Sequence, residues 1–341
     1  MFVAFCNPLI DITIDVEKSY LEKWKLKSGD ACLANSKLQS LVEEAIKNKN
    51  ALITVGGGSQ NALVKCRWMS LNKIETAIIG SVGDDENKKK LKRTLSKYGV
   101  KCHYQIIPND VTGCSVILIH NNNRTMVTSL GASGKMSFNY WDSPNVLNTV
   151  RNSNLVLIST FFIRSSEKIA LSVALECLRL KKTIAISLSS VSAIKSPCWP
   201  TLKEIFKVST IVFGNESEME CFAKELNLIS FNDKKTHQEI TKKIANYSNS
   251  MIKKIILTTR GPNSTICCET GKEPIERPAI NIDKFKIVDT NSAGDSFAGG
   301  FIAYYLKGHS LEKCIDAGNY CAFCSIQERG GNVPRYSPNF K

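Results

Sequence analysis

Short apolar runs alternate with amphipathic segments over the second half of the chain. The runs have the length of single buried strands and lie at residues 155–159, 183–188, 211–213 and 255–258. Buried strands that alternate with helices are typical of a parallel sheet covered by helices on both faces. Because ligands of such sheets bind beyond the carboxyl ends of the strands, we expect the functional residues to lie there.

The first third of the chain is less regular. Residues 76–82 have the pattern of a further strand of the main sheet. Two stretches, about 12–35 and 103–130, have the pattern of paired strands, with turn residues at Ser28-Gly29-Asp30 and Asn121-Asn122-Asn123. We expect these stretches to form a small β-sheet apart from the main one.

The length of the chain suits one large α/β domain with a small appendage, so we predict a single domain over residues 1–341. Hydrophobic residues make up 43% and charged residues 22% of the chain, which are ordinary values for a globular protein with a sizeable core. The predicted fold class is therefore α/β, with a central, mostly parallel sheet flanked by helices and a small β-sheet beside it.

The net charge of +14 raises the question of a polyanionic partner. The densest basic run, Lys88-Lys89-Lys90-Leu91-Lys92-Arg93, contains an apolar leucine and is followed by Leu95 and Tyr98. This spacing is typical of a helix whose charged face lies in solvent. We therefore do not expect the chain to bind nucleic acid.

Cysteine usage and the N-terminal residues bear on the compartment. The chain has 13 cysteines without a framework spacing, which favours free thiols and a reducing environment. Residues 1–8 have no basic lead and no long apolar run, and no other stretch has the length of a membrane span. We expect a cytoplasmic protein that has no membrane partner.

The most informative candidate for chemistry is Asp289-Thr290-Asn291-Ser292-Ala293-Gly294-Asp295, between a strand-like run and an apolar helix. The start of a helix leaves backbone N–H groups free and carries positive potential. The N–H groups of residues 292–294 would cradle a phosphate, and Asp295 could accept a proton from an attacking hydroxyl. The alternative is an ordinary helix start at which Asp295 only complements the dipole.

Two N-terminal segments offer further ligand contacts. Gly56-Gly57-Gly58-Ser59-Gln60-Asn61 lets a ligand approach the backbone, and its spacing matches neither the dinucleotide-binding fingerprint nor the P-loop. Asn7-Pro8-Leu9-Ile10-Asp11 ends an apolar strand on a carboxylate, which could accept hydrogen bonds from both hydroxyls of a vicinal diol. A plain turn and a turn cap are the respective alternatives.

A fourth segment, Asn215-Glu216-Ser217-Glu218, follows the apolar run at 211–213. An amide and a carboxylate three residues apart at a strand end could hold water molecules around Mg²⁺. A helix start with acidic residues in its first turn is the alternative. The four histidines lie in no metal or triad motif, so neither a zinc enzyme nor a hydrolase is supported.

Taken together, these segments resemble the ribokinase-like carbohydrate and nucleoside kinases. Residues 289–301 resemble the C-terminal signature of that family, and residues 56–61 its N-terminal glycine motif. The resemblance is closest to the members that phosphorylate adenosine, and it runs along nearly the whole chain. It extends to Asn7-Pro8-Leu9-Ile10-Asp11-Ile12, Asn123-Arg124, Phe213-Gly214-Asn215-Glu216 and Ala317-Gly318-Asn319-Tyr320.

The resemblance implies an ATP-dependent phosphorylation of the 5′-hydroxyl of adenosine, aided by Mg²⁺, in a monomer whose small sheet closes over the nucleoside. It implies that Asp295 is the base, that Ser292, Ala293 and Gly294 form the anion hole, and that Arg124 meets the transferring phosphate. The implied substrate contacts are Asn7, Leu9, Asp11, Leu33, Gly57, Gly58, Asn61, Met126, Leu130 and Phe161. The implied contacts to ATP are Asn215, Thr259, Gly261 and Asn319, and Glu218 is implied to contact the metal through water.

Three positions depart from the family pattern. Ser292 stands where a glycine is usual, Ala31 where a glutamine contacts the base, and Ser192 where an aromatic residue is usual. These departures leave the acceptor open, and a related kinase that acts on another nucleoside or on a sugar is the alternative. A catalytically silent nucleoside-binding protein is disfavoured, because such a protein would most simply lack Asp295.

Overall fold

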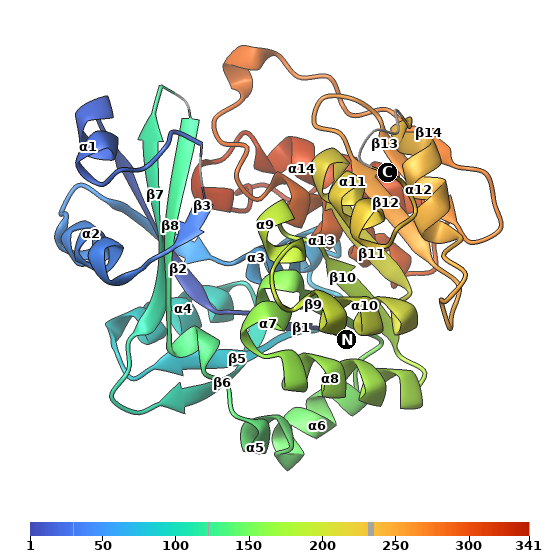
Figure 1. Cartoon of the computed structure of the whole chain (residues 1–341), viewed down its shortest axis with the longest axis horizontal. Helices are drawn as coiled ribbons and strands as arrows, with labels where there is room; N and C mark the ends of the chain where they lie inside the picture. The colour runs from blue at the N-terminus through green and yellow to red at the C-terminus, as the bar shows by residue number, and fades with distance from the viewer. Residues whose placement is uncertain (30, 122, 231–234, 341) are drawn as a thin grey trace.

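The computed structural model describes residues 1–29, 31–121, 123–230 and 235–340. In this part of the chain two β-sheets are flanked by helices (Figure 1). The strands are β1 (Phe2–Phe5), β2 (Leu9–Asp15), β3 (Ala31–Leu33), β4 (Leu52–Gly56), β5 (Thr76–Gly83), β6 (Val100–Ile107), β7 (Thr112–His120), β8 (Asn123–Gly131), β9 (Leu155–Ser159), β10 (Thr183–Ser187), β11 (Ile211–Asn215), β12 (Ile255–Thr259), β13 (Thr265–Glu269) and β14 (Ile275–Arg277).

The α-helices of the described chain lie between and after these strands. They are α1 (Lys18–Lys23), α2 (Ser36–Lys47), α3 (Gly58–Met69), α4 (Glu86–Lys97), α5 (Phe138–Trp141), α6 (Pro144–Arg151), α7 (Thr160–Ser165), α8 (Glu167–Arg179), α9 (Val191–Ile194), α10 (Trp199–Val208), α11 (Glu216–Glu225), α12 (His237–Ala245), α13 (Ala293–Tyr305) and α14 (Leu311–Ser325). Short 3-10 helices are η1 (Ala132–Gly134), η2 (Lys284–Lys286) and η3 (Arg329–Gly331). None of the helices in the described ranges combines the length and apolar character needed to cross a membrane.

The large sheet has nine strands in the order β14-β13-β12-β11-β10-β9-β1-β5-β6. Pairing is parallel from β12 through to β6, whereas β13 and β14 are antiparallel at one edge. The prediction of a central, mostly parallel sheet is confirmed. The apolar runs identified in the sequence coincide with β5, β9, β10, β11 and β12 to within two residues.

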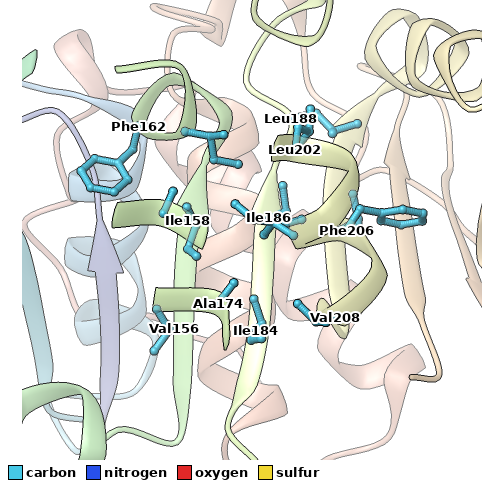
Figure 2. Close-up of a cluster of buried hydrophobic side chains, with 14 of the residues drawn as sticks. Val156, Ile158, Phe162, Ala174, Ile184, Ile186, Leu188, Leu202, Phe206 and Val208 are labelled. Atoms are coloured by element: carbon cyan, nitrogen blue, oxygen red, sulfur yellow. The ribbon is translucent and has the colours of Figure 1, made fainter. Parts of the chain in front are cut away.

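Side chains of the central strands alternate between two helical layers. Val156 and Ile158 of β9 belong to a buried cluster formed with helices α6 to α8, α10 and α11, part of which Figure 2 shows. The neighbouring Leu155 and Leu157 point to the opposite face, in a cluster formed with α3, α13 and α14. This double burial explains why β9 reads as a continuous apolar run, and it fixes the positions of the strand ends that follow.

The small sheet has five strands in the order β3-β8-β7-β2-β4. One face carries Ile12 and Val116, which pack with Leu41 of α2 and Leu91 of α4 in a third buried cluster. The residues just before these two, Asp11 and Ser115, point to the other face of the sheet. The sheet stands beside the carboxyl ends of the large sheet, drawn in blue and green in Figure 1.

The boundaries of the small sheet differ from the expected stretches 12–35 and 103–130. The sheet begins at Leu9 and includes β4 as an edge strand. Residues 103–107 belong instead to β6, which pairs with β5 over its whole length in the large sheet. The expected turns at 28–30 and 121–123 each include one residue, Asp30 and Asn122, outside the described residues.

Candidate active site

A cleft of about 600 Å³ lies between the strand ends of the large sheet and the inner face of the small sheet. Its floor comes from the residues at and just after the carboxyl ends of β1, β9, β10, β11 and β12, together with the start of α13. Its other wall comes from β2, β3, β7 and β8. The cleft therefore lies at the strand ends, where the sequence leads us to expect functional residues.

The cleft brings together most of the predicted site residues from distant parts of the chain. Its lining includes Asn7, Leu9, Asp11, Leu33, Gly57, Gly58, Asn61, Met126, Leu130, Phe161, Asn215, Glu218, Thr259, Ser292, Ala293, Gly294 and Asp295. Arg124, Gly261 and Asn319 do not line it. The lining also contains residues that the sequence did not single out, among them Arg164, Ser115 and Thr128.

Asp295 lies in the first turn of α13, which begins at Ala293. Asn61 of α3 donates a hydrogen bond from Nδ2 to Asp295 Oδ2 at 3.1 Å. A Cβ atom at Gly58 would stand 2.6 Å from Asp295 Oδ1, so only a glycine at this position leaves room for the carboxylate of Asp295. Burial raises the pKa of Asp295, while the Asn61 hydrogen bond and the positive charge of Lys65 oppose the rise.

Ser292 precedes α13 with a left-handed backbone, at φ 63° and ψ 9°. This conformation costs a residue with a side chain about 1–2 kcal/mol, which explains why glycine is usual at this position in the family the sequence resembles. The Ala293 N–H donates weakly to the Thr290 carbonyl at 3.3 Å. Among the described residues no carbonyl accepts from the Gly294 N–H, and a Cβ atom at Gly294 would have open space around it. An anion can therefore approach this end of the helix.

Asp11 is 8% exposed and lies on β2 opposite β4. A Cβ atom at Gly56 would overlap its carboxylate, at 1.9 Å from Oδ1, so the glycine motif makes room for two carboxylates at once. Burial raises the pKa of Asp11 to about 7, with further contributions from the charges of Asp295 and Asp289. A ligand that donates hydrogen bonds to Asp11 would favour its ionised form.

Lys65 is a buried charge near Asp295 that the sequence reasoning missed, although it does not line the cleft. It is fully buried on α3, one helical turn after Asn61, and its Nζ donates to the backbone carbonyl of Asn332. Burial lowers the pKa of Lys65 to about 8, and the negative charge of Asp295 is among the groups that oppose this. A lysine inside the apolar stretch that starts at Ala62 was the available signal, since lysine is almost never fully buried without a partner.

Replacing Lys65 with methionine should shift the acidic limb of the kcat–pH profile to higher pH. The charge of Lys65 lowers the pKa of Asp295, so its removal lets that pKa rise and leaves less of the ionised base at a given pH. Lys65→Arg should keep the profile of the wild type, and Lys90→Met, at an exposed position on α4, serves as the control. A uniform loss of activity at all pH values would mean that Lys65 has a structural role only.

Arg124 does not reach the cleft but forms an ion pair with Asp289, in the loop before α13. Asp289 also accepts from the N–H of Asn291 at 2.7 Å and from the N–H of Gly330 at 3.0 Å. The ion pair joins β8 of the small sheet to the loop that carries the expected anion hole. In this conformation the guanidinium is held beside the site by a carboxylate.

Asn215 and Glu218 form a capping box at the start of α11. Asn215 Oδ1 accepts from the Glu218 N–H at 2.9 Å, and Glu218 Oε2 accepts from the Asn215 N–H at 3.0 Å. The segment is thus a helix start with an acidic first turn that also lines the cleft. Burial raises the pKa of Glu218; hydrogen bonds from Asn215 oppose the rise, and the charge of Asp295 adds to it.

Asn319 and Gly261, two of the expected contacts to ATP, do not line the cleft. Asn319 of α14 accepts from Thr265 Oγ1 at 2.8 Å and donates to the Pro278 carbonyl at 3.1 Å. Gly261 follows β12 with φ +54°, and a Cβ atom there would have nothing within 4 Å. Asn319 thus holds the segment after β14 in place, and Gly261 provides a turn beside Thr259, which does line the cleft.

The whole arrangement matches a known family. Residues 28–337 match the model of the pfkB family carbohydrate kinases, and the chain belongs to that family. Within it, the chain is 32% identical to an adenosine kinase of Saccharomyces cerevisiae, with 97% of this chain and 96% of the relative covered. It is 30% identical to an adenosine kinase of Dictyostelium discoideum, with coverage of 98% and 97%.

Solved structures agree with this assignment. The fold superposes with a TM-score of 0.90 on an Anopheles gambiae adenosine kinase in complex with P1,P4-di(adenosine-5) tetraphosphate, at 30% identity and with 98% and 99% of the two chains covered. It superposes with a TM-score of 0.89 on a Schistosoma mansoni adenosine kinase in complex with 2-fluoroadenosine, at 27% identity and with 98% and 97% covered. The predicted ribokinase-like fold is confirmed.

Proposed function

We propose that this chain is an ATP:adenosine 5′-phosphotransferase that works through Asp295. The observation that carries the proposal is the pairing of Asp295 with Asn61 at an open helix start, inside a cleft that also holds Asp11. Relatives and solved structures that resemble it along nearly its whole length include the adenosine kinases of Dictyostelium discoideum, Saccharomyces cerevisiae and Anopheles gambiae. A free sugar as acceptor would leave the wall formed by Leu33, Phe161 and Met126 without a partner.

The geometry supports a direct transfer. Asp11 accepts hydrogen bonds from the ribose hydroxyls, and the purine lies against the apolar wall of the small sheet. Asp295 then takes the proton of the 5′-hydroxyl while the hydroxyl oxygen attacks the γ-phosphorus of ATP, and ADP leaves as the bond from this phosphorus to the β–γ bridging oxygen breaks. The N–H groups at the start of α13 bind the developing negative charge on the phosphoryl oxygens.

Magnesium fits Asn215 and Glu218, which are expected to lie beside ATP, when the ion is held through water. Both oxygens of Glu218 already accept from Asn215, so they are better placed to accept from water than to ligate an ion directly. In the described ranges no three His, Cys, Asp or Glu side chains are grouped to hold a metal. A bound Mg²⁺ ion would neutralise charge on the phosphates, while Asn215 and Glu218 orient its water shell.

A direct assay tests the proposal. The purified chain is incubated with γ-labelled ATP and Mg²⁺ and with adenosine, inosine, guanosine, ribose or fructose in separate reactions. We expect labelled AMP from adenosine and no labelled sugar phosphate. Transfer to ribose or fructose, with none to adenosine, would show a sugar kinase instead.

Cytoplasmic location and a monomeric state stay predictions.

Removing the ribose 2′-hydroxyl should make a poor substrate. Asp11 accepts from both hydroxyls, and a hydrogen bond to a charged group contributes about 1.5–3 kcal/mol, so adenosine should exceed 2′-deoxyadenosine in kcat/KM by about 10–100-fold. In Asp11→Ala this ratio should shrink, because both nucleosides then lack the same partner. Asp15→Ala, at the exposed end of β2, is the matched control. An unchanged ratio in Asp11→Ala would exclude Asp11 from the ribose site.

A further inference from the structure

Arg164 is a cleft residue to which neither the phosphoryl transfer nor the ribose contacts assign a role. It lies near the end of α7, which follows β9 directly. The helix is held at both ends: Ser159 Oγ accepts from the Phe162 N–H at 3.2 Å, and Ser165 Oγ accepts from Asn7 Nδ2 at 2.9 Å. The place of Arg164 in the wall is therefore well defined.

The position of Arg164 relates it to the purine rather than to the phosphates. Phe161 lies three residues earlier on the same helix, so the two side chains share one face of α7, and both line the cleft. Phe161 is 43% exposed and belongs to the apolar wall that would face the purine. The anion-binding start of α13 is built from other elements. Arg164 thus stands beside the expected base.

Arg164 is half-buried, and among the described residues it makes no hydrogen bond or ion pair. The carboxylate next along the chain, Glu167, accepts from Thr201 Oγ1 at 2.5 Å instead. The hydroxyls of Ser190 and Ser192 lie 3.1 Å apart and bond with each other. A guanidinium carries five donors, so Arg164 offers a fork of N–H groups to a ligand in the cleft.

Two other positions of the cleft lining carry small side chains. Ala31 and Ser192 line the same cleft, at positions where larger side chains, a glutamine and an aromatic residue, were expected. The three carboxylates that line the cleft, Asp11, Glu218 and Asp295, are not within ion-pair distance of Arg164. The donors of Arg164 are therefore available to solvent or to a ligand in the cleft.

The chemistry of purines indicates which ligand this is. A 6-oxopurine presents O6 and N7 as two neighbouring acceptors, which match the two parallel N–H groups of an arginine. Adenine presents N7 beside an N6 amine, and the amine is a donor that a guanidinium cannot accept from. The guanidinium can therefore donate one hydrogen bond to adenosine, at N7, and two to inosine or guanosine, at O6 and N7.

We propose that Arg164 is a specificity-determining residue, through which this site also takes 6-oxopurine nucleosides as phosphoryl acceptors. The inference rests on the proposed function, because the same transfer follows. The 5′-oxygen forms a bond to the γ-phosphorus of ATP, the bond from that phosphorus to the β–γ bridging oxygen breaks, and ADP leaves. The proton of the 5′-hydroxyl passes to Asp295, and inosine becomes its 5′-monophosphate.

Steady-state kinetics with adenosine and inosine test the inference in the full-length wild type, Arg164→Met and Arg164→Lys. We expect the wild type to use inosine with a kcat/KM within about 30-fold of that for adenosine. Arg164→Met should lower the value for inosine by about 10–100-fold more than the value for adenosine, because inosine then loses two contacts to the guanidinium and adenosine loses one. Arg164→Lys should fall between, because a lysine keeps the charge but not the fork.

Lys168→Met removes one positive charge a turn further along the chain, at an exposed position outside the cleft, and should change neither value. Thermal unfolding of each variant, and calorimetric titration of inosine without ATP, separate lost recognition from lost folding. Inosine turnover below a thousandth of that with adenosine in the wild type would overturn the inference and leave the proposed function standing. An equal loss for both nucleosides in Arg164→Met would also overturn it. Turnover of neither nucleoside by the wild type would refute the proposed function itself.

Discussion

Replacing Asp295 with asparagine is expected to lower kcat by about 10²–10⁴-fold, the usual contribution of a positioned general base. Asparagine keeps the shape of the side chain and fits the space that Gly58 leaves, but it cannot take the proton of the 5′-hydroxyl. Adenosine affinity should stay within a few-fold of the wild type, because Asp11 and the apolar wall are untouched. The measurement is kcat by a coupled ADP assay, with the adenosine Kd from calorimetry.

The pH dependence of kcat and a matched control variant make this substitution diagnostic. The pKa of Asp295 is raised by burial, so the wild-type activity should fall as the pH drops through the pKa of the base, and Asp295→Asn should lack this limb. Asp142→Asn, at an exposed position after α5, is the matched control and should retain full activity. Retention of more than a tenth of wild-type kcat in Asp295→Asn would show that another group is the base.

Replacing Arg124 with alanine is expected to lower kcat by about 10²–10³-fold, with a smaller effect on the KM for adenosine. The proposed task of the guanidinium is to stabilise negative charge on the transferring phosphoryl group, and this charge develops after the nucleoside has bound. In the structure Arg124 is paired with Asp289, so it must exchange this carboxylate for the phosphate during turnover.

Asp289→Asn separates the two roles of Arg124. It removes the negative charge from the ion pair and keeps one oxygen, which can still accept from the N–H of Asn291, whereas the N–H of Gly330, which donates to the other oxygen of Asp289, loses its acceptor. We expect a much smaller loss of kcat than in Arg124→Ala, since the arginine is then freed for the phosphate. Arg93→Ala, on the exposed face of α4, controls for the lost charge. Equal losses in Arg124→Ala and Asp289→Asn would make the ion pair itself the functional unit.

The sequence predicts the large sheet well because its strands are buried on both faces. A strand such as β9 must then be apolar throughout, and this pattern is visible without knowledge of any partner. The small sheet was less well predicted, since its strands have one face on the cleft. β4 begins with two exposed apolar residues, Leu52 and Ile53, and β3 is three residues long, so neither has a clear period of two.

Among the site residues, those at strand ends and helix starts carried a local signal. The glycines at 56–58 and the acid at 295 stand in recognisable contexts, although the reason for the glycines, room for two carboxylates, needs coordinates. The pairing of Arg124 with Asp289 joins residues 165 positions apart, and nothing local predicts it. Lys65 was missed because a buried lysine contradicts the rule that assigns lysine to the surface.

The turn at the C-terminal end of the fold has a consequence for biosynthesis. Gly330 donates to Asp289, and the carbonyl of Asn332 accepts from Lys65, so residues that follow α14 complete the surroundings of Asp295 and of the loop before α13. A polypeptide is synthesised from its N-terminus, and its early segments fold first. A nascent chain halted before residue 330 could form most of the large sheet, yet it would lack both of these contacts. The surroundings of Asp295 should therefore be complete only after translation has passed this turn.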